Sequence, residues 1–344
     1  MKNSTPISLT FMLMSTLLSA YCYGASESDG ASKNPIKTPA FSVYKDVTVD
    51  ADLTSAALQS SVTGAKQAIT SAMPRDLSTL TWAFANGTCG AEKWGSMSAD
   101  AMASNVSKFV AAGKKYIVST GGQGGVFTCD SDANFNTFIK TYYSANLVGI
   151  DFDIEAGQSQ ADIDNLVARV HAAQATYPDM KFYFTVGTWA PSKYGSALAL
   201  DMGPTKSATD AGSPNPLGPY GVMVMKAIQA ANLTNYTINL MTMDYGTPAS
   251  SSICVVRDAA CDMGQSAIQA AMDFHGYYGI PYSQIALTSM SGPNDVADEI
   301  FTNVDTDTLT AWSKTKGIAA LSFWSFDRDV GLSYTNAFIS GLGY

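Results

Sequence analysis

Three acidic side chains alternate with large apolar ones in the segment from Leu147 to Glu155, LVGIDFDIE. Because side chains alternate across a β-strand, Asp151, Asp153 and Glu155 all point to one face of it. The outer two carboxyls lie about 13 Å apart along such a strand, with Asp153 midway. Crowding and burial raise the pKa of a carboxyl, so that it can donate a proton near neutral pH. A solvated strand face is the alternative, but it does not need such strongly apolar flanking residues.

The sequence GIDFDIE resembles the signature of glycoside hydrolase family 18, usually written DGxDxDxE. The resemblance extends from about Phe41 to the C-terminus. It implies that Glu155 is the catalytic proton donor and that Asp153 and Asp151 are the two acids preceding it. The first Asp of the signature is replaced by Val148, the position most remote from the chemistry.

Two further motifs of the family follow neighbouring predicted strands. The sequence STGG, which ends in Gly122, is similar to the family's SxGG motif, although a glycine pair is also a common turn. The family often has M-x-Y-D after its sixth strand, where the Tyr hydroxyl holds the substrate's acetamido group. Here Met243 takes the place of that Tyr, Asp244 matches, and Tyr245 follows one residue later. Either Tyr245 brings its hydroxyl into the site or this contact is altered; Met243 could instead pack within the barrel.

Aromatic residues are the remaining candidates for binding sugar. The resemblance implies that Trp324 forms the floor beneath the sugar that is cleaved, because an aromatic face packs well on a pyranose ring; the alternative is a core residue. Trp189 is a candidate platform in a loop on the same predicted rim. Trp94, Tyr194 and Tyr220 are further candidates, with loop packing as the alternative for each.

The resemblance implies a chitinase that hydrolyses β-1,4 links between N-acetylglucosamine units by substrate-assisted, retaining catalysis. In this mechanism the acetamido oxygen of the substrate attacks the anomeric carbon, and Glu155 protonates the leaving oxygen and then activates water. Asp153 orients the acetamido group and shares a proton with Asp151. Two alternatives stay open: an endo-β-N-acetylglucosaminidase that acts on N-glycans, and a non-catalytic chitin-binding lectin.

The elements that must position these residues alternate along the chain. Strands are predicted at 41–44, 79–85, 115–119, 147–155, 181–186, 236–243, 284–289 and 317–326. Helical periodicity is found between them at 100–112, 160–176, 220–231, 265–277 and 305–316. Eight strand–helix units of this kind predict a (β/α)8 TIM barrel, whose active site lies at the carboxyl ends of the strands. An open, doubly wound sheet is the alternative, but it gives no reason for eight units.

Composition limits the partners and cofactors. The chain has 344 residues, 46% hydrophobic and 14% charged, which suits one large globular domain. Its net charge is −9 and it has no basic cluster, which argues against nucleic acid and anionic membranes as partners. The only histidines, His171 and His275, lie in predicted helices and no CxxC occurs. We therefore expect no metal and no cofactor. The resemblance implies chitin or N-acetylglucosamine oligomers as ligands, and a monomer is expected.

The N-terminus predicts export. Residues 1–24 resemble a signal peptide, residues 25–38 form a flexible leader, and 39–344 form the catalytic domain. The apolar run is too short for a comfortable membrane span, so a secreted protein is expected. The four cysteines that remain favour disulfides in such a protein. We expect Cys254 to pair with Cys261 across one loop, and Cys89 with Cys129 across the loops after strands two and three.

The connection after the seventh strand bears on the shape of the cleft. Some chitinases of the family carry a small domain there, which walls a deep tunnel. Here only about fifteen residues separate Ser289 from Asp305, too few for a domain of at least about 50 residues. An open cleft and endo-type cleavage are therefore expected, although the segment 189–219 could wall the other side.

Overall fold

Nine short parallel strands form the inner layer of this computed structural model, which describes residue 1 and residues 37–190, 215–246 and 253–344. Their order around the sheet is β1-β19-β16-β13-β12-β11-β9-β5-β2. Their bounds are β1 Ala40–Phe41, β2 Val43–Asp46, β5 Thr79–Ala85, β9 Lys115–Gly121, β11 Leu147–Asp153, β12 Lys181–Gly187, β13 Thr237–Thr242, β16 Ile285–Met290 and β19 Ala320–Trp324.

The sheet closes because its first strand is shared between two neighbours. Strand β1 pairs with β19, where Phe41 lies opposite Leu321, and β2 pairs with β5, where Val43 lies opposite Leu80. Ser42 joins the two halves, and its N–H donates to the Leu321 carbonyl at 3.3 Å. The halves β1 and β2 together act as one strand, so the barrel has the eight strands of the predicted (β/α)8 fold, which is confirmed.

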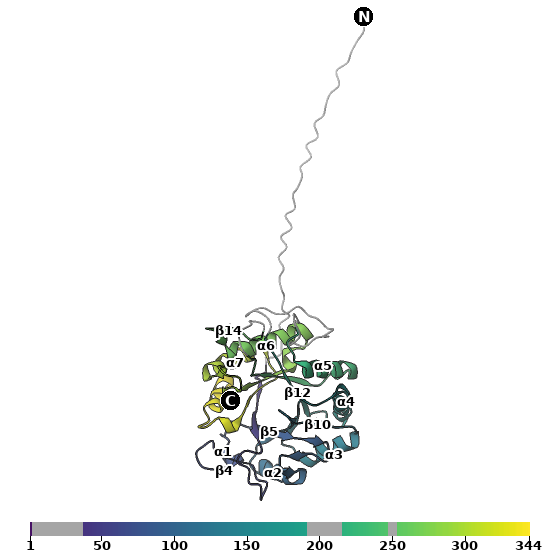
Figure 1. The fold of residues 1–344 in the computed structure, drawn as a ribbon, viewed down its shortest axis with the longest axis vertical. Coiled ribbons are helices and arrows are strands. Elements are labelled where there is room, and N and C mark those ends of the chain that lie inside the picture. The colour runs from purple at the N-terminus through teal and green to yellow at the C-terminus, as the bar shows by residue number, and fades with distance from the viewer. Residues whose placement is uncertain (2–36, 191–214, 247–252) are drawn as a thin grey trace. The chain divides into compact units, whose positions relative to one another are not determined.

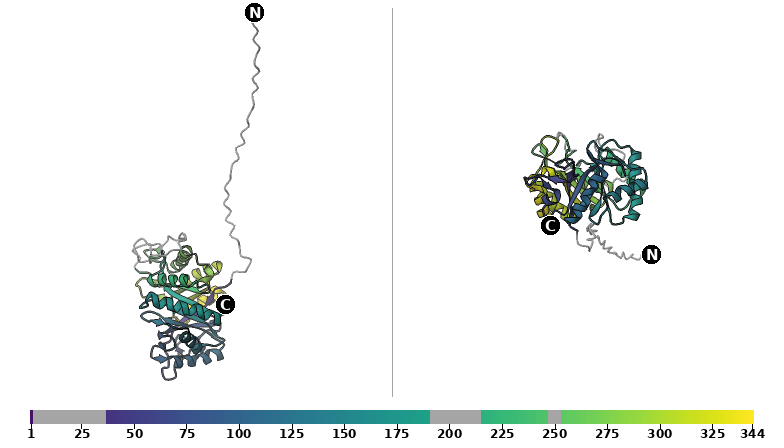
Figure 2. Two further views of the ribbon diagram at one scale, coloured as in Figure 1. Left: turned by 90° about the vertical axis from the view of Figure 1, so that its right-hand side faces the viewer. Right: turned by 90° about the horizontal axis from the view of Figure 1, so that it is seen from below.

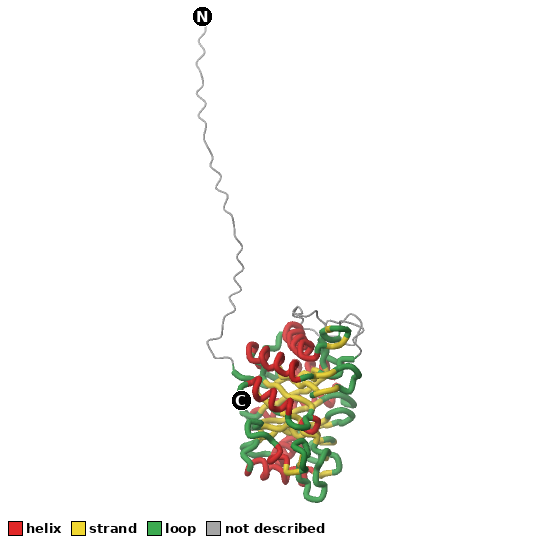
Figure 3. Tube along the Cα trace, turned by 90° about the vertical axis from the view of Figure 1, so that its left-hand side faces the viewer, coloured by secondary structure: helices red, strands yellow, loops and turns green. Residues whose placement is uncertain are grey.

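Helices cover the outside of the barrel (Figure 1). Further views from three sides show them as an outer layer around the strands (Figures 2 and 3). They are α1 Ile69–Ala72, α2 Ala99–Ala111, α3 Asp132–Tyr142, α4 Gln160–Thr176, α5 Pro219–Ala231, α6 Met263–Tyr278, α7 Asn303–Lys316 and α8 Ser333–Leu342, with 3-10 turns η1 Tyr282–Gln284 and η2 Phe326–Arg328. The five predicted helices are present, while α3 and α8 lie outside the predicted ranges. Capping boxes begin α4 at Ser159 and α7 at Thr302, which accounts for their sharp starts.

The acid strand ends earlier than its pattern predicts. β11 stops at Asp153, whereas the prediction extends it to Glu155. The chain keeps its direction for one more residue, because the Ile154 N–H donates to the Thr185 carbonyl at 2.9 Å. Gly157, with a φ of +74°, then turns the chain. Glu155 therefore lies on the loop that begins at the carboxyl end of the barrel.

Short two-stranded sheets lie in the loops. They pair β3 Gln59–Ser60 with β4 Gln67–Ala68, β6 Gly87–Thr88 with β10 Phe127–Thr128, β7 Lys93–Trp94 with β8 Met97–Ser98, β14 Val256–Arg257 with β15 Ala260–Cys261, and β17 Gly292–Pro293 with β18 Ile300–Phe301. The last pair fills the connection between β16 and α7. The prediction that this connection holds no inserted domain is thus confirmed.

Both predicted disulfides are present. Cys89 and Cys129 lie next to the paired strands β6 and β10, and their Cα atoms are 5.1 Å apart. Cys254 and Cys261 are joined across the β14–β15 hairpin, with Cα atoms 5.7 Å apart. Each bond therefore ties down a loop at the carboxyl end of the barrel.

The described residues from 37 to 344 form one compact unit. The predicted signal peptide at 1–24 lies outside the described residues except for Met1, and the leader at 25–38 does so except for its last two residues. No helix in the described part of the chain is long and apolar enough to cross a membrane.

Candidate active site

The predicted acids meet at a pocket on the carboxyl end of the barrel. The pocket is open to solvent and leaves about 110 Å³ for the centres of water molecules. It is lined by Tyr44, Phe84, Gln123, Asp153, Glu155, Thr185, Met241, Met243, Asp244, Thr288, Met290, Asp295 and Trp324. Asp153 reaches it from the inward register at the end of β11, and Glu155 reaches it from the loop that follows. Asp151, one step deeper, is buried beneath them.

Asp151 is held by hydroxyl groups from three strands, the adjacent β9 and β12 and, from across the barrel, β2. Its Oδ2 accepts from the Tyr44 hydroxyl at 2.9 Å and from Ser119 Oγ at 2.5 Å, and its Oδ1 accepts from Thr185 Oγ1 at 2.6 Å. Burial raises the pKa of Asp151 to about 6, against the lowering effect of these hydrogen bonds. Asn239 completes the cluster, since its amide donates to the Tyr44 hydroxyl at 3.1 Å and to Thr185 Oγ1 at 2.8 Å. The Asp151 carboxyl is therefore fixed in one orientation.

Asp153 is equally buried but has a different environment. Its Oδ1 has no hydrogen-bond partner among the described residues. Burial raises the pKa of Asp153 well above its ordinary value, and the charges of Glu155 and Asp151 raise it further. No described hydrogen bond joins Asp153 to Asp151, so the expected shared proton between them stays a prediction. Asp153 lines the pocket and therefore keeps a buried acceptor beside it that no described residue uses.

Glu155 lies half-buried at the pocket wall. Burial raises its pKa to about 7, and the nearby Asp244 carboxylate adds to the shift. A carboxyl with this pKa is partly protonated at neutral pH, as a general acid must be. The raised pKa that crowding and burial predict for an acid of this row is thus supported by the surroundings of Glu155.

The turn after β13 carries Met243 and Asp244 into the pocket wall. Asp244 has a φ of +49°, in the left-handed region, which redirects the chain there. Its Oδ1 accepts the backbone N–H groups of Asp295 and Val296 at 2.9 and 3.0 Å. In return, the Asp244 N–H donates to Asn294 Oδ1 at 3.2 Å. The turn is therefore locked to the loop after β16, next to Glu155.

Tyr245 and Trp189 do not line the pocket. Tyr245 is only 2% exposed and belongs to the core, because the turn at Asp244 directs its ring away from the barrel interior. Its N–H donates to Glu299 Oε2 at 3.0 Å, and its carbonyl accepts from the Trp189 indole at 2.9 Å. The described contacts thus correct the expectation that the Tyr245 hydroxyl enters the pocket, and they give Trp189 a place that supports the turn.

Trp324 forms an aromatic floor together with two residues that the sequence did not single out. Its ring stacks on Phe84, with centroids 5.5 Å apart and planes at 14°, and lies 6.2 Å from the Tyr44 ring. The peptide bonds Ala83–Phe84 and Trp324–Ser325 are cis. Gly122 does not line the pocket; it leaves room for Phe84, because a Cβ there would lie 2.6 Å from that ring. Its predicted role is therefore indirect.

Several pocket residues escape the motif search, although alternation along their strands could have indicated them. Tyr44, Thr185, Met241, Thr288 and Met290 share the inward register of their strands with the acids or with Trp324. No short motif marks them, so only a full assignment of strand registers would have found them.

The other candidate platforms have different fates. Trp94 is completely buried, and its indole donates to the Tyr142 hydroxyl at 2.8 Å, so the prediction of a sugar platform is wrong there. The Tyr220 hydroxyl accepts the Gly157 N–H at 3.0 Å, close to the loop that follows Glu155. Tyr194 lies outside the described residues. The described part of the chain holds no cluster of His, Cys, Asp and Glu suited to a metal ion.

The comparisons with known proteins give a structural likeness without a close relative. No family model matches the chain, and no curated protein matches it. The catalytic domain of a hyperthermophilic chitinase from Pyrococcus furiosus is 22% identical, with a TM-score of 0.63 over 90% of this chain and 98% of its own. A putative chitinase A from Streptomyces coelicolor is 18% identical, with a TM-score of 0.55 over 89% and 99% of the two chains. A family GH18 chitinase from Chromobacterium violaceum is 18% identical, with a TM-score of 0.56 over 90% and 85%. At these identities the likeness shows that the chain shares their barrel fold.

Proposed function

We propose that the protein is a chitinase of the glycoside hydrolase family 18 type, which hydrolyses β-1,4 links between N-acetylglucosamine units. The observation that carries the proposal is the graded row of Asp151, Asp153 and Glu155 beneath an aromatic floor at Trp324. Two further facts support it: the sequence GIDFDIE and the chitinases among the structural neighbours.

Glu155 is the proposed general acid. It donates its proton to the glycosidic oxygen as the C–O bond breaks, and the substrate's acetamido oxygen forms the new bond to the anomeric carbon. The carboxylate of Glu155 then takes a proton from the attacking water, which opens the oxazolinium ring and restores the acid. Its pKa of about 7 suits both steps, because neither protonation state is strongly disfavoured near neutrality.

Asp153 is proposed to hold the acetamido group in place. Its unpartnered Oδ1 can accept the acetamido N–H, and this contact strengthens as positive charge develops on the ring. Asp151 is proposed to act from below, where its hydroxyl partners keep it fixed. Met243 and Asp244 form the wall at which the family has a Tyr hydroxyl, so the acetamido group is proposed to meet a thioether there.

The cleft shape supports endo-type cleavage. The connection between β16 and α7 holds only the β17–β18 hairpin, so this side of the pocket has no domain to close it into a tunnel. Residues 191–214, which belong to the segment that could wall the other side, lie outside the described residues. Two disulfides favour an oxidising compartment, which supports export of the protein.

Incubation with the chitin hexamer tests the proposal. We expect soluble oligomers of mixed length to appear early, with the first product retaining the β anomeric configuration by NMR. Fully deacetylated chitosan and cellulose should resist hydrolysis, because they lack the acetamido nucleophile. Binding of the hexamer without turnover would identify a lectin instead. Release of glycans from a glycoprotein, with the hexamer left intact, would identify an endo-β-N-acetylglucosaminidase.

A further inference from the structure

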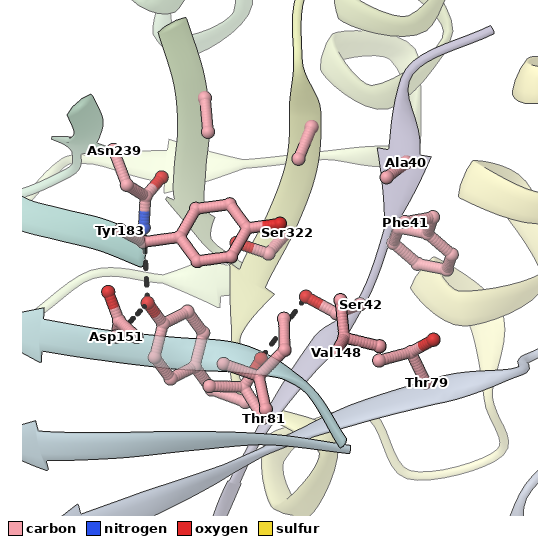
Figure 4. A pocket seen from close by; sticks show the side chains of 14 residues that line it. Ala40, Phe41, Ser42, Thr79, Thr81, Val148, Asp151, Tyr183, Asn239 and Ser322 are labelled. Atoms are coloured by element: carbon pink, nitrogen blue, oxygen red, sulfur yellow. Dashed lines mark hydrogen bonds between the residues drawn. The ribbon is translucent and has the colours of Figure 1, made fainter. Parts of the chain in front are cut away.

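A second cavity lies inside the barrel, on the far side of Asp151 from the sugar pocket (Figure 4). Tyr44 and Asp151 line its inner end, while Ala40, Thr79 and Val148 line it near the amino ends of their strands. The sugar pocket and this cavity share Tyr44 as a common wall. Asp151 therefore lies between the sugar pocket and this second cavity.

The cavity exists because the inward positions at this end of the barrel are small. Bulky branched residues usually fill the interior of a TIM barrel. Here the inward residues include Ser42, Thr81, Ala286, Ala320 and Ser322. About 50 Å³ is left for the centres of water molecules, whereas one ordered water needs roughly 10–15 Å³. The small side chains therefore leave room for a few water molecules in a row.

The cavity opens toward the amino end of the barrel. Val148, Tyr183 and Ala320 point into the barrel, yet each is only half-buried. The first two of them, with Thr79, also line a wider depression in the surface, whose rim carries Lys37, Lys115 and Lys181 among others. Solvent can therefore reach the cavity from the side opposite to the sugar pocket.

Polar groups along the cavity give waters something to bind. The Thr81 hydroxyl donates to Ser42 Oγ at 3.1 Å, which leaves the proton of Ser42 available. No described hydrogen bond involves the hydroxyl of Tyr183, whose ring stands in the cavity (Figure 4). At the inner end, the Tyr44 hydroxyl bridges Asn239 and Asp151. A water that binds between these groups finds the two or more polar partners that a buried water requires.

We infer that this cavity holds a chain of water molecules through which Asp151 exchanges protons with solvent at the amino end of the barrel. A role for this proton exchange in catalysis rests on the proposed function. A bound polymer covers the front pocket and separates Asp153 and Glu155 from bulk water. The rear channel keeps the acid row in contact with solvent while the front is covered.

The proton transfer needs no co-reactant. When Asp151 loses its proton, its O–H bond breaks as the neighbouring hydroxyl or water gains that proton and passes on one of its own. The last water releases a proton to bulk solvent, and the reverse sequence reprotonates Asp151. The groups that face Asp151 from the surrounding strands are Tyr44, Ser119, Asp153, Tyr183, Thr185 and Asn239.

The first test is hydration of the free protein. High-resolution crystallography, or NMR transfer of magnetisation from water, should reveal ordered waters between Tyr183 and Tyr44. A dry cavity overturns the inference. Because this measurement needs no substrate, it tests the channel even if no chitin oligomer binds, an outcome that would count against the proposed function alone.

The second test closes the channel. Ala286→Val adds two methyl groups to the cavity without polar atoms, and β-branched residues suit a strand. The exchange of the Tyr44 hydroxyl proton is followed by NMR with tyrosine labelled with ¹³C at its hydroxyl-bearing carbon. The protein carries Glu155→Gln and is saturated with chitin hexamer, so that only the rear route is open. We expect Ala286→Val to slow this exchange at least about tenfold, because it then depends on local opening.

Ala111→Val is the matched control. It adds the same two methyl groups at an exposed position of α2, away from the cavity, so exchange should stay within about threefold of the parent. Ala320→Val fills the same cavity from β19 and replaces Ala286→Val if that variant does not fold. Equal exchange rates in the parent and a folded valine variant would overturn the inference.

Discussion

The two ends of the barrel interior differ in the size of their inward side chains. Along β19 the inward residues increase from Ala320 through Ser322 to Trp324, and along β13 the polar Asn239 is followed by Met241. The carboxyl end therefore offers large apolar surfaces that suit a sugar ring, while the amino end leaves a space between small side chains, several of which carry hydroxyl groups. The same strands thus line both the sugar pocket and the second cavity. Of the acids on β11, Asp153 lines the pocket and Asp151 lines the cavity.

Asp151 and Asp153 also differ from each other. They are two residues apart and both buried, yet Asp151 accepts three hydroxyl hydrogen bonds and Asp153 Oδ1 accepts none from described residues. A buried carboxyl oxygen without a partner is costly to the free protein. The contrast suggests that Asp151 is held by hydrogen bonds within the protein, whereas Asp153 Oδ1 receives its hydrogen bond from the substrate.

The largest effect should come from Glu155→Gln. The amide keeps the shape of the side chain but cannot donate the proton, so turnover of the chitin hexamer should fall about 10²–10⁴-fold or more. The exposed Asp307 on α7 provides a control, since Asp307→Asn also removes one carboxylate but should leave the rate unchanged. Activity of Glu155→Gln within about tenfold of the parent would contradict its role as the acid.

The comparison between the two aspartates is sharpened by Asp153→Asn and Asp151→Asn. Asp153→Asn should reduce kcat severely, by about 10²-fold, because the contact with the acetamido group strengthens in the transition state. Asp151→Asn should reduce it less, because this carboxyl acts through its neighbours. Steady-state kinetics of the two variants decide the order, and a larger loss for Asp151→Asn would reverse the assignment of roles.

The pH dependence of kcat/KM should report the protonation of Glu155 and the influence of Asp244 on it. Because Glu155 must be protonated to act as the acid, kcat/KM should decline as the pH rises through about 7. Asp244→Asn removes a negative neighbour, which favours the charged form of Glu155 and lowers its pKa. The alkaline limb should therefore move to lower pH by up to about one unit. A limb that stays in place would show that Asp244 does not influence the acid.

The smallest effect should be on stability. The pKa of Glu155 is raised from 4.5 to about 7, so ionisation of Glu155 destabilises the folded state increasingly from pH 4.5 to 7 and fully above that range. Glu155→Gln should therefore raise Tm by a few degrees at pH 8, at about 2–4 °C per kcal/mol, and have little effect at pH 4. Calorimetry at the two pH values measures the difference, and equal shifts at both would argue against a raised pKa.

Periodic elements were predictable from sequence, and contacts between distant elements were not. Strand β5 and helix α4 have the predicted bounds, because continuous apolar runs and helical periodicity depend only on neighbouring residues. The acid row was predictable for the same reason. Tyr44 was not, since its role arises only when β2 lies across the barrel from Thr185 and Asp151.

The errors in the site follow from one physical limit. Alternation assigns a side chain to a face only while the strand continues. β13 ends at Thr242, and the left-handed Asp244 redirects the chain, so the position of Tyr245 could not be read from its spacing. Trp94 was misplaced because a local pattern cannot show whether a loop tryptophan meets a buried partner such as Tyr142.

The divided first strand links the two ends of the chain. β1 pairs with β19, and the Tyr344 hydroxyl donates to the Pro39 carbonyl at 2.5 Å. The barrel therefore cannot close during synthesis until β19 has emerged, and this late, long-range pairing is slow by nature. Until then the barrel lacks the pairing between β1 and β19 and stays incompletely folded. The pairing of β1 with β19 thus makes the time at which the barrel folds depend on synthesis of its last strand.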